Sequence, residues 1–363
     1  MTATGGALEG VRIVEFAGIG PAPFAAMLLA DMGAEIVRVD RPAAKLMIPN
    51  HITGRGRPTV QADLKDADDV ERVRALVDSA DALIEGFRPG VMERLGLGPD
   101  LLIERNPRLV YARMTGWGQE GPLAPFAGHD INYIAITGAL AAIGPSDRPV
   151  PPLNLVGDYG GGALYLVNGV LAGLLSAGRT GKGQVVDCAM CDGAVSLMSP
   201  FFEMAAAGRW KPEREANMLD GGAPYYGVYR CADGLDVAVG AIEPQFFAEL
   251  CRGLGIDEAE MAGRNDQAQW PALREKLATV IASKPRAEWL ERLEYGDACF
   301  TGVVTYEQAA DNPHLAARRS MVEVAGLMQP APAPRFLGTP SAIRSERRET
   351  LTLNQAAARW VAR

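Results

Sequence analysis

The chain has 363 residues, of which 48% are hydrophobic and 22% charged, and its formal net charge is −8 at pH 7. This composition excludes a disordered chain, a collagen-like repeat and a disulfide scaffold, and the acidic balance argues against a dedicated nucleic-acid binder. A chain of this length is expected to form roughly two domains.

The sequence carries no obvious targeting signal. The N-terminus lacks a basic segment followed by a long apolar run, so no signal peptide is expected. No run of about 18 uninterrupted apolar residues is found, so we expect no membrane span. Five cysteines without a regular framework indicate a reducing compartment. We therefore expect a cytoplasmic protein.

The first two hundred residues alternate between β-type and helical patterns. Strands are predicted for residues 11–16, 35–39, 81–86, 108–114 and 184–188. Helices are predicted for residues 21–32, 66–80 and 189–206, and for an apolar stretch from about 158 through 174. Repeated β-α-β units are typical of a mostly parallel sheet covered by helices, which makes this an α/β fold.

The pattern changes after residue 207. A polar stretch with Gly and Pro is followed by two β-rich runs around Asp233-Gly234, which predict a hairpin. Helices are predicted for residues 244–254, 270–283 and 287–293. We predict a large domain at 1–207 completed by 330–363, a linker at 208–224, a smaller domain at 225–320, and a return linker at 321–336.

A glycine-bearing turn follows the first predicted strand. Gly18-Ile19-Gly20 resembles the start of a dinucleotide-binding fingerprint, and Asp40 ends the second strand at about the expected distance. The third position of the fingerprint is Pro23 instead of Gly or Ala. We therefore favour a tight β-to-α turn over a nicotinamide site.

Basic side chains gather at predicted strand ends and in loops. They are Arg38, Arg41, Arg55, Arg57, Lys65, Arg88 and Arg94. The loops at the carboxyl ends of parallel strands converge on the ligand crevice, and guanidinium groups bind phosphates in bidentate fashion. Scattered exposed arginines are equally common, so the spacing leaves both interpretations open.

Two residues are candidates for acid/base chemistry. His129 is one of only three histidines and lies beside Gly128, which permits close backbone approach. Asp158 lies among glycines just before an apolar helix. A lone histidine is usually a structural hydrogen-bonding group, and Asp is a favoured helix N-cap. The alternative for Asp158 is a carboxylic acid at the positive end of a helix, where a substrate approaches.

Cys188 and Cys191 have the spacing of a redox or zinc pair. No second pair and no nearby histidine would complete a metal site. The two residues fall across a strand end and a helix start, so packing is the favoured interpretation.

Seven separated segments carry a family resemblance in the same order. They are VEFAGIGPAPFAAMLLADMGAEIVRVDRP, ADLK, IEGFRPGVMERLGLG, YARMTGWGQEGP, GHDINYIAITGAL, LVGDYGGGALYLVNGVLAG and GKGQVVDCAM. Together they resemble the class III coenzyme A transferase superfamily and, more narrowly, the α-methylacyl-CoA racemases. The resemblance implies a Rossmann-like large domain built from both chain ends, a smaller α+β domain, and an interlocked homodimer. It implies no metal and no cofactor, because CoA is part of the substrate.

The resemblance also implies site residues. His129 and Asp158 would be the two acid/base groups, Glu243 would orient His129, and Asn154 would hydrogen-bond Asp158. The residues that would hold the CoA thioester are Arg41, Ala62, Asp63, Leu64, Lys65, Gly86, Phe87, Arg88, Arg94, Gly128, Asp130, Ile131, Asn132 and Tyr133.

These residue types suit the inversion of a stereocentre next to a thioester carbonyl. Inversion needs a base on one face and an acid on the other, with donors for the enolate oxygen. The alternative within the superfamily is a CoA transferase, in which an aspartate matching Asp158 forms a covalent ester. Transferases generally lack the histidine at position 129, so its presence favours a racemase. A non-catalytic acyl-CoA-binding protein would need neither group.

Overall fold

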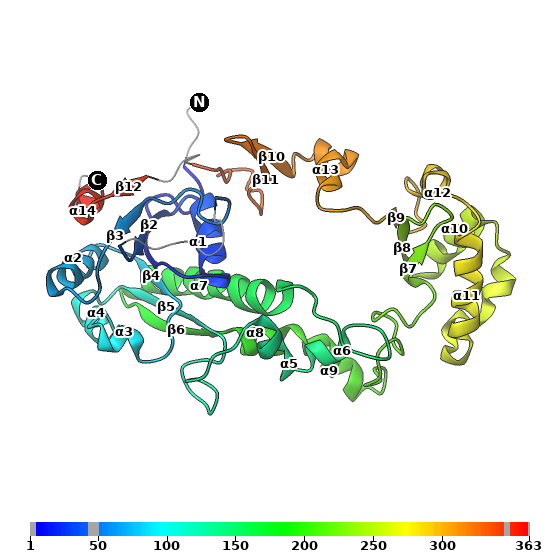
Figure 1. Ribbon diagram of the computed structural model, residues 1–363, viewed down its shortest axis with the longest axis horizontal. Helices are drawn as coiled ribbons and strands as arrows, with labels where there is room; N and C mark the ends of the chain where they lie inside the picture. The colour runs from blue at the N-terminus through cyan, green and yellow to red at the C-terminus, as the bar shows by residue number, and fades with distance from the viewer. Residues whose placement is uncertain (1–4, 43–50, 345–348, 362–363) are drawn as a thin grey trace. The chain divides into compact units, whose positions relative to one another are not determined.

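The computed structural model describes residues 5–42, 51–344 and 349–361 (Figure 1). The chain divides into two compact units. Unit 1 comprises Met1–Thr137, Leu153–Met198 and Pro313–Arg363, and unit 2 comprises Gly138–Pro152 and Ser199–Asn312. Each unit is therefore assembled from segments that are distant in the sequence.

The unit boundaries differ from the predicted domain boundaries in several places, and residues 313–320, expected in the smaller domain, belong to unit 1. Residues 138–152, expected in the large domain, belong to unit 2 together with residues 199–224. The reason is a set of contacts from the polar stretch that was expected to be a linker. The Arg214 guanidinium donates hydrogen bonds to the carbonyls of Ala141, Pro145 and Ser146, and Glu215 accepts one from the Ser146 N–H.

Unit 1 is built on a seven-stranded sheet with strand order β12-β3-β2-β1-β4-β5-β6. Every neighbouring pair is parallel. The strands are β1 (Arg12–Phe16), β2 (Glu35–Asp40), β3 (Thr59–Gln61), β4 (Ala82–Glu85), β5 (Val110–Thr115), β6 (Gln184–Ala189) and β12 (Thr350–Leu351). The chain runs outward from β1 in one direction and then restarts at β4 on its other side. The crevice for a ligand is expected at this switch point.

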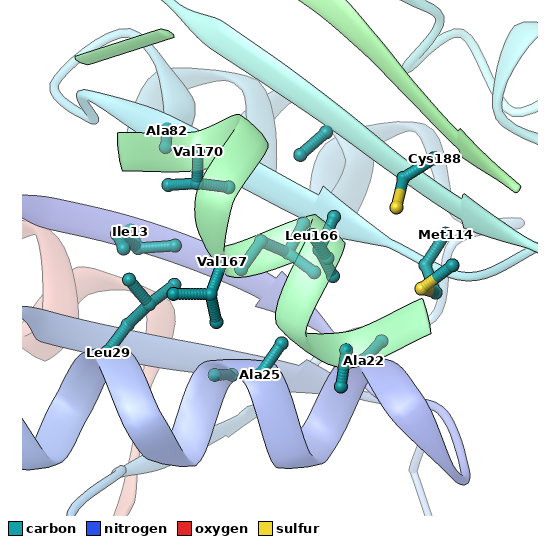
Figure 2. Close-up of a cluster of buried hydrophobic side chains, with 14 of the residues drawn as sticks. Ile13, Ala22, Ala25, Leu29, Ala82, Met114, Leu166, Val167, Val170 and Cys188 are labelled. Carbon is teal, nitrogen blue, oxygen red and sulfur yellow. The ribbon is translucent and has the colours of Figure 1, made fainter. Parts of the chain in front are cut away.

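Helices cover both faces of the sheet. They include α1 (Pro21–Asp31), α2 (Ala67–Val77), α3 (Val91–Arg94), α4 (Pro99–Arg105), α5 (Asp130–Ala135), α7 (Leu164–Thr180), α8 (Met190–Leu197) and α14 (Leu353–Val361), and unit 1 also contains α13 (Pro313–Ala317). Successive residues of β1 alternate between two cores, Ile13 in one and Val14 in the other. Figure 2 shows the first core, where Leu29 of α1 lies near Val167 of α7. The predicted parallel α/β architecture is confirmed.

A long apolar helical stretch passes through this core. A π-helix (Leu155–Ala163) continues into α7, and the combined Leu155–Thr180 is long and apolar enough to cross a membrane by length and composition alone. No such segment was expected from the sequence, because its apolar runs are interrupted. Leu166 and Val170 of this stretch are fully buried among residues of α1 and the sheet, which is the setting of a core helix.

Unit 2 contains a three-stranded antiparallel sheet, β7-β8-β9, with helices packed on it. Its strands are β7 (Tyr226–Arg230), β8 (Asp236–Gly240) and β9 (Phe300–Gly302). Its helices include α6 (Ala139–Ala142), α9 (Ser199–Ala206), α10 (Pro244–Leu254), α11 (Trp270–Ile281) and α12 (Arg286–Leu293). The predicted hairpin is present, and Gly234 in its turn has a positive φ of 77°. The single helix predicted over 189–206 is two helices, α8 and α9.

The segment expected as an extended return linker has structure of its own. Strands β10 (Met321–Val324) and β11 (Leu327–Pro330) form an antiparallel pair. Arg55 anchors this pair to the rest of unit 1 by donating hydrogen bonds to Gln329 Oε1 and the Pro330 carbonyl, both at 2.8 Å.

Candidate active site

The turn between β1 and α1 forms one wall of the candidate site. Gly20 precedes α1 with φ 71° and ψ −122°, a conformation that favours glycine. A Cβ atom on Gly20 would lie 3.2 Å from Asp158 Oδ2. The carboxylate of Asp158 therefore lies over the first turn of α1, at the carboxyl edge of the parallel sheet.

Asp158 is held inside the π-helix, so it is not the helix N-cap that one interpretation predicted. Glycines allow this unusual helix to pack closely. A Cβ atom on Gly161 would lie 2.7 Å from the Ala194 nitrogen of α8, and one on Gly162 would lie 2.8 Å from Met190 Cγ. π-helical segments are frequent at functional sites. The run of glycines around Asp158 thus serves packing as well as access.

Asp158 is hydrogen-bonded to Asn154 and to Asp130. The predicted hydrogen bond from Asn154 is present, with Nδ2 donating to Asp158 Oδ2 at 3.0 Å. The backbone N–H of Asp158 donates to Asp130 Oδ2 at 2.7 Å. Partial burial raises the pKa of the Asp158 carboxyl group, and the charge of Asp130 raises it further, against the opposing effects of Asn154 and His129. A raised pKa brings a carboxyl group closer to the range needed of an acid/base catalyst.

His129 lies at the N-cap position of α5, directly before Asp130. Its side chain is exposed, and its backbone N–H donates to Asn132 Oδ1 at 3.1 Å. Tyr133 is buried on the same helix, where its hydroxyl donates to the Gly128 carbonyl and its ring meets Trp117 edge-on at 4.7 Å. Ile131 is exposed. The turn before α5 is thus locked while the imidazole stays accessible.

The structure brings together most of the predicted acid/base group. His129, Asp130, Asn154 and Asp158 all belong to unit 1, and His129 is near enough to affect the titration of Asp158. Glu243 belongs to unit 2, where it is the exposed N-cap residue of α10. Its orientation of His129 therefore stays a prediction.

Four predicted CoA-binding cations lie near strand ends of the same sheet. Arg41 follows β2, Lys65 follows β3, and Arg88 follows β4, with Arg94 on α3 just beyond. All four side chains are exposed. Between them, Ala62 is buried and the Asp63 N–H donates to Asp69 Oδ2 at 2.8 Å. Exposed cations at this edge are the arrangement expected for holding phosphates.

The turn that carries Arg88 is held by a buried carboxylate. Glu85 Oε2 accepts the Phe87 N–H at 2.7 Å, and Glu85 Oε1 pairs with Arg113 at 2.9 Å. Arg113 also pairs with Glu93 at 2.8 Å. Burial is the main cause of the raised pKa of Glu85. The turn at residues 86–88 is thereby held in position by the buried Glu85 side chain.

Three of the seven basic candidates are structural. Arg38, Arg55 and Arg57 are buried, so the phosphate-binding interpretation is wrong for them. Arg55 pairs with Asp31 at 2.5 Å, and Arg57 pairs with Glu15 at 3.3 Å. Arg57 also donates to the Pro23 carbonyl at 2.7 Å, which secures the first turn of α1. The acidic residues in a buried strand and helix were the available signal for these pairs.

The two cysteines of the CxxC spacing are free thiols. Cys188 is buried, and burial raises its pKa to about 12. Within the described ranges, no three His, Cys, Asp or Glu side chains form a group that could hold a metal ion.

One contact at the site was absent from the sequence interpretation. Asp130 was expected to contribute to substrate binding, and nothing indicated that its side chain bonds the Asp158 backbone, 28 residues away. A contact of that separation requires knowledge of how α5 packs against the π-helix.

A parallel sheet with exposed cations at its carboxyl edge, beside a histidine and an aspartate, is the arrangement expected of a protein that handles acyl-CoA thioesters. The chain belongs to CoA-transferase family III, which it matches over residues 8–350. Its relatives include α-methylacyl-CoA racemases. It is 45% identical to the mouse (Mus musculus) enzyme over 92% of this chain and 87% of that one. It is 44% identical to the human (Homo sapiens) enzyme over 92% of this chain and 88% of that one.

Solved structures of the family share the fold. A CaiB/BaiF family protein from Brucella suis superposes with a TM-score of 0.83 at 25% identity, covering 99% of this chain and 100% of that one. Rv3272 from Mycobacterium tuberculosis superposes with a TM-score of 0.79 at 27% identity, covering 97% of this chain and 99% of that one.

Proposed function

We propose that this chain is an isomerase that interconverts the (R) and (S) forms of 2-methylacyl-CoA thioesters. The observation that carries the proposal is the presence of His129 and Asp158 on neighbouring elements of unit 1, joined through the hydrogen bond from the Asp158 N–H to Asp130, with the pKa of Asp158 raised by burial. The names of the mouse and human relatives support the same reaction. Lipid metabolism follows as the setting.

The chemistry proceeds by proton transfer at the carbon next to the thioester carbonyl. One of the two groups removes the α-proton from one face, and the other delivers a proton to the opposite face of the enolate. A positioned acid or base contributes about 10²–10⁴-fold in rate. The enolate oxygen needs hydrogen-bond donors, and the backbone N–H groups of His129 and Asp130 are the candidates. Because Asn132 takes the His129 N–H, the Asp130 N–H is the donor that remains.

The CoA part of the substrate is assigned to the exposed cations. Its phosphates would be held by Arg41, Lys65, Arg88 and Arg94. Residues 86–88 would contact the remainder of the CoA moiety. CoA is part of the substrate, and we expect the reaction to need no other cofactor and no metal. The Asn154 amide would hold the Asp158 carboxyl group in place.

We further propose that the working form is an interlocked homodimer in which Glu243 orients His129. The family resemblance supports the dimer. A second support is that unit 1 carries exposed apolar side chains on α7 and α8 and on the edge strand β6: Leu164, Leu175, Val185, Val195 and Leu197. Strand β6 contacts both helices, and exposed apolar side chains that gather on a surface are typical of association sites.

The function is tested by incubating the protein with a single enantiomer of a 2-methylacyl-CoA in heavy water. We expect loss of optical purity and incorporation of deuterium at the 2-position, without any acyl acceptor. Activity that requires a free carboxylic acid, with an enzyme ester trapped by hydroxylamine, would instead identify the transferase alternative.

The roles of the two groups are tested by single substitutions. His129→Ala and Asp158→Ala should each nearly abolish racemisation, because the enolate is then reprotonated on the face from which the proton left. Each variant should still exchange the α-proton of one enantiomer, and the two variants should prefer opposite enantiomers. Stereospecific exchange followed by NMR measures this. Exchange of the same enantiomer by both variants would contradict the two-base assignment.

A further inference from the structure

We propose that the Asp130 side chain is a positioning residue that sets the separation between the two acid/base groups. It would do so by tying the backbone at Asp158 to the start of the helix that follows His129. The inference rests on the proposed function, since it assigns a role within the same reaction.

The contact is short and buried. Asp130 is only 7% exposed, and its Oδ2 accepts the Asp158 N–H at 2.7 Å. Its other oxygen, Oδ1, is buried and accepts no hydrogen bond within the described part of the chain. A charged side chain is rarely buried with half of its acceptors unused. We therefore attribute the buried position of this carboxylate to the one hydrogen bond that it accepts from the π-helix.

The neighbouring glycine shows how closely the two segments approach. A Cβ atom on Gly157 would lie 2.5 Å from Asp130 Oδ2 and 3.1 Å from Ile134 Cγ2. Glycine at 157 thus lets the π-helix reach α5. Bonds elsewhere hold both partners: Tyr133 and Trp117 fix α5, and α8 packs on the π-helix. Asp130 joins two elements that are each already anchored.

The position of Asp130 in the chain connects this bond to catalysis. His129 is its immediate neighbour, so a shift of Asp130 relative to Asp158 is also a shift of His129 relative to Asp158. A displacement of 1 Å between reacting groups costs about 10²-fold in rate. The hydrogen bond between Asp130 and Asp158, which are 28 positions apart in the sequence, therefore directly affects the proton-transfer geometry.

The charge of Asp130 adds a second, separable effect, because it helps to keep the pKa of Asp158 above its ordinary value. The other groups facing Asp158 are His129 directly before α5, Tyr133 on α5, and Asn154 in its own segment. The helix α8 also packs on the π-helix, and its titratable residues are Cys191 and Asp192. The charged residues of α1 and α7 are Asp31, paired with Arg55, and Arg179 in the last turn.

Two substitutions separate the bond from the charge. Asp130→Asn keeps an oxygen acceptor for the Asp158 N–H and can place its amide nitrogen at the unbonded position. We expect a less than tenfold loss of kcat, with the acid limb of the pH profile of kcat/KM moved to lower pH. Asp130→Ala removes both bond and charge, and we expect about a 10²-fold loss of kcat with KM nearly unchanged.

Asp192→Asn on α8 is the matched control, because it removes an exposed carboxylate near the site that makes no bond to the π-helix. Its kcat and pH profile should match the wild type. Circular dichroism establishes that each variant is folded. If folded Asp130→Ala keeps wild-type kcat, or if Asp130→Asn leaves the acid limb in place, the inference is overturned. Wild-type racemisation is measured separately, so its absence would refute the proposed function instead.

Discussion

At the scale of single residues, the carboxyl group of Asp158 combines two opposing demands. Its position over Gly20 leaves it accessible to a substrate, yet its partial burial raises the pKa and makes the charged form less favourable in the folded protein. Active sites commonly retain such unfavourable groups at some expense in stability. The raised pKa therefore has a consequence for folding that can be measured without substrate.

Asp158→Asn should unfold at a higher temperature than the wild type at neutral pH. The folded-state pKa lies above the unfolded value, so ionisation of Asp158 opposes folding at pH above that folded value. The effect disappears below the unfolded value of about 3.9. The difference in melting temperature should therefore shrink as the pH falls.

Thermal denaturation from pH 4 to pH 8 is the measurement. Asp147→Asn, in an exposed loop, is the control and should not alter the melting temperature at either end. An Asp158→Asn variant that is less stable than the wild type at pH 7 would contradict the prediction.

At the scale of secondary structure, the buried pair between β4 and β5 supports the predicted CoA-binding turn. Arg113 on β5 contacts two carboxylates in very different surroundings. The Glu85 side chain is completely buried and also accepts the Phe87 N–H, whereas the Glu93 side chain is 44% exposed. The two glutamates therefore allow an internal comparison on one arginine.

Glu85→Ala should lower the free energy of unfolding by about 3 kcal/mol, at the lower end of the range for breaking a buried pair, since Arg113 keeps Glu93. It should also raise KM for the thioester, because the turn at 86–88 loses its anchor. Glu93→Ala should lower the free energy of unfolding by less than about 1 kcal/mol. Urea denaturation measures both, and equal losses would show that burial does not govern this pair.

The elements of unit 1 could largely be predicted from the sequence, because buried parallel strands and amphipathic helices have strong local patterns. The predicted runs at 11–16, 35–39 and 108–114 correspond to β1, β2 and β5. The short strands β3 and β12 were missed, since two or three residues carry no periodicity. Their existence depends on pairing with each other and with β2.

The site could be predicted in part for a similar reason. His129, Asn154 and Asp158 belong to segments that resemble a family, and the Asn154–Asp158 bond spans only four residues. The π-helix could not be predicted, because it depends on the fit of glycines against α8 and α5. The burial of Arg55 and Arg57 was not predicted either: acidic residues in the buried β1 and α1 were the only signal, and each arginine pairs with a residue far along the chain.

At the scale of the whole molecule, the predicted catalytic residues are divided between the two units. His129 and Asp158 belong to unit 1, and Glu243 belongs to unit 2. In the proposed homodimer, Glu243 orients His129. Assembly is therefore part of the proposed mechanism.

The chain should sediment as a dimer that does not dissociate on dilution without unfolding. Interlocked chains can separate only after at least one of them unfolds. The dimer should therefore persist at nanomolar concentration. Sedimentation velocity with a fluorescent label measures the mass directly. A stable folded monomer at that concentration would exclude the interlocked arrangement.

The pairing of β3 with β12 has a consequence for how the protein is made. Thr59 and Val60 pair with Thr350 and Leu351, near the opposite end of the chain. Ribosomes add about 5–20 residues per second, so the outer edge of β3 waits for tens of seconds before its partner is synthesised. An unpaired strand edge is a template for association with other chains. The nascent protein therefore passes through a period in which its sheet is open on one side, and chaperone binding is most useful there.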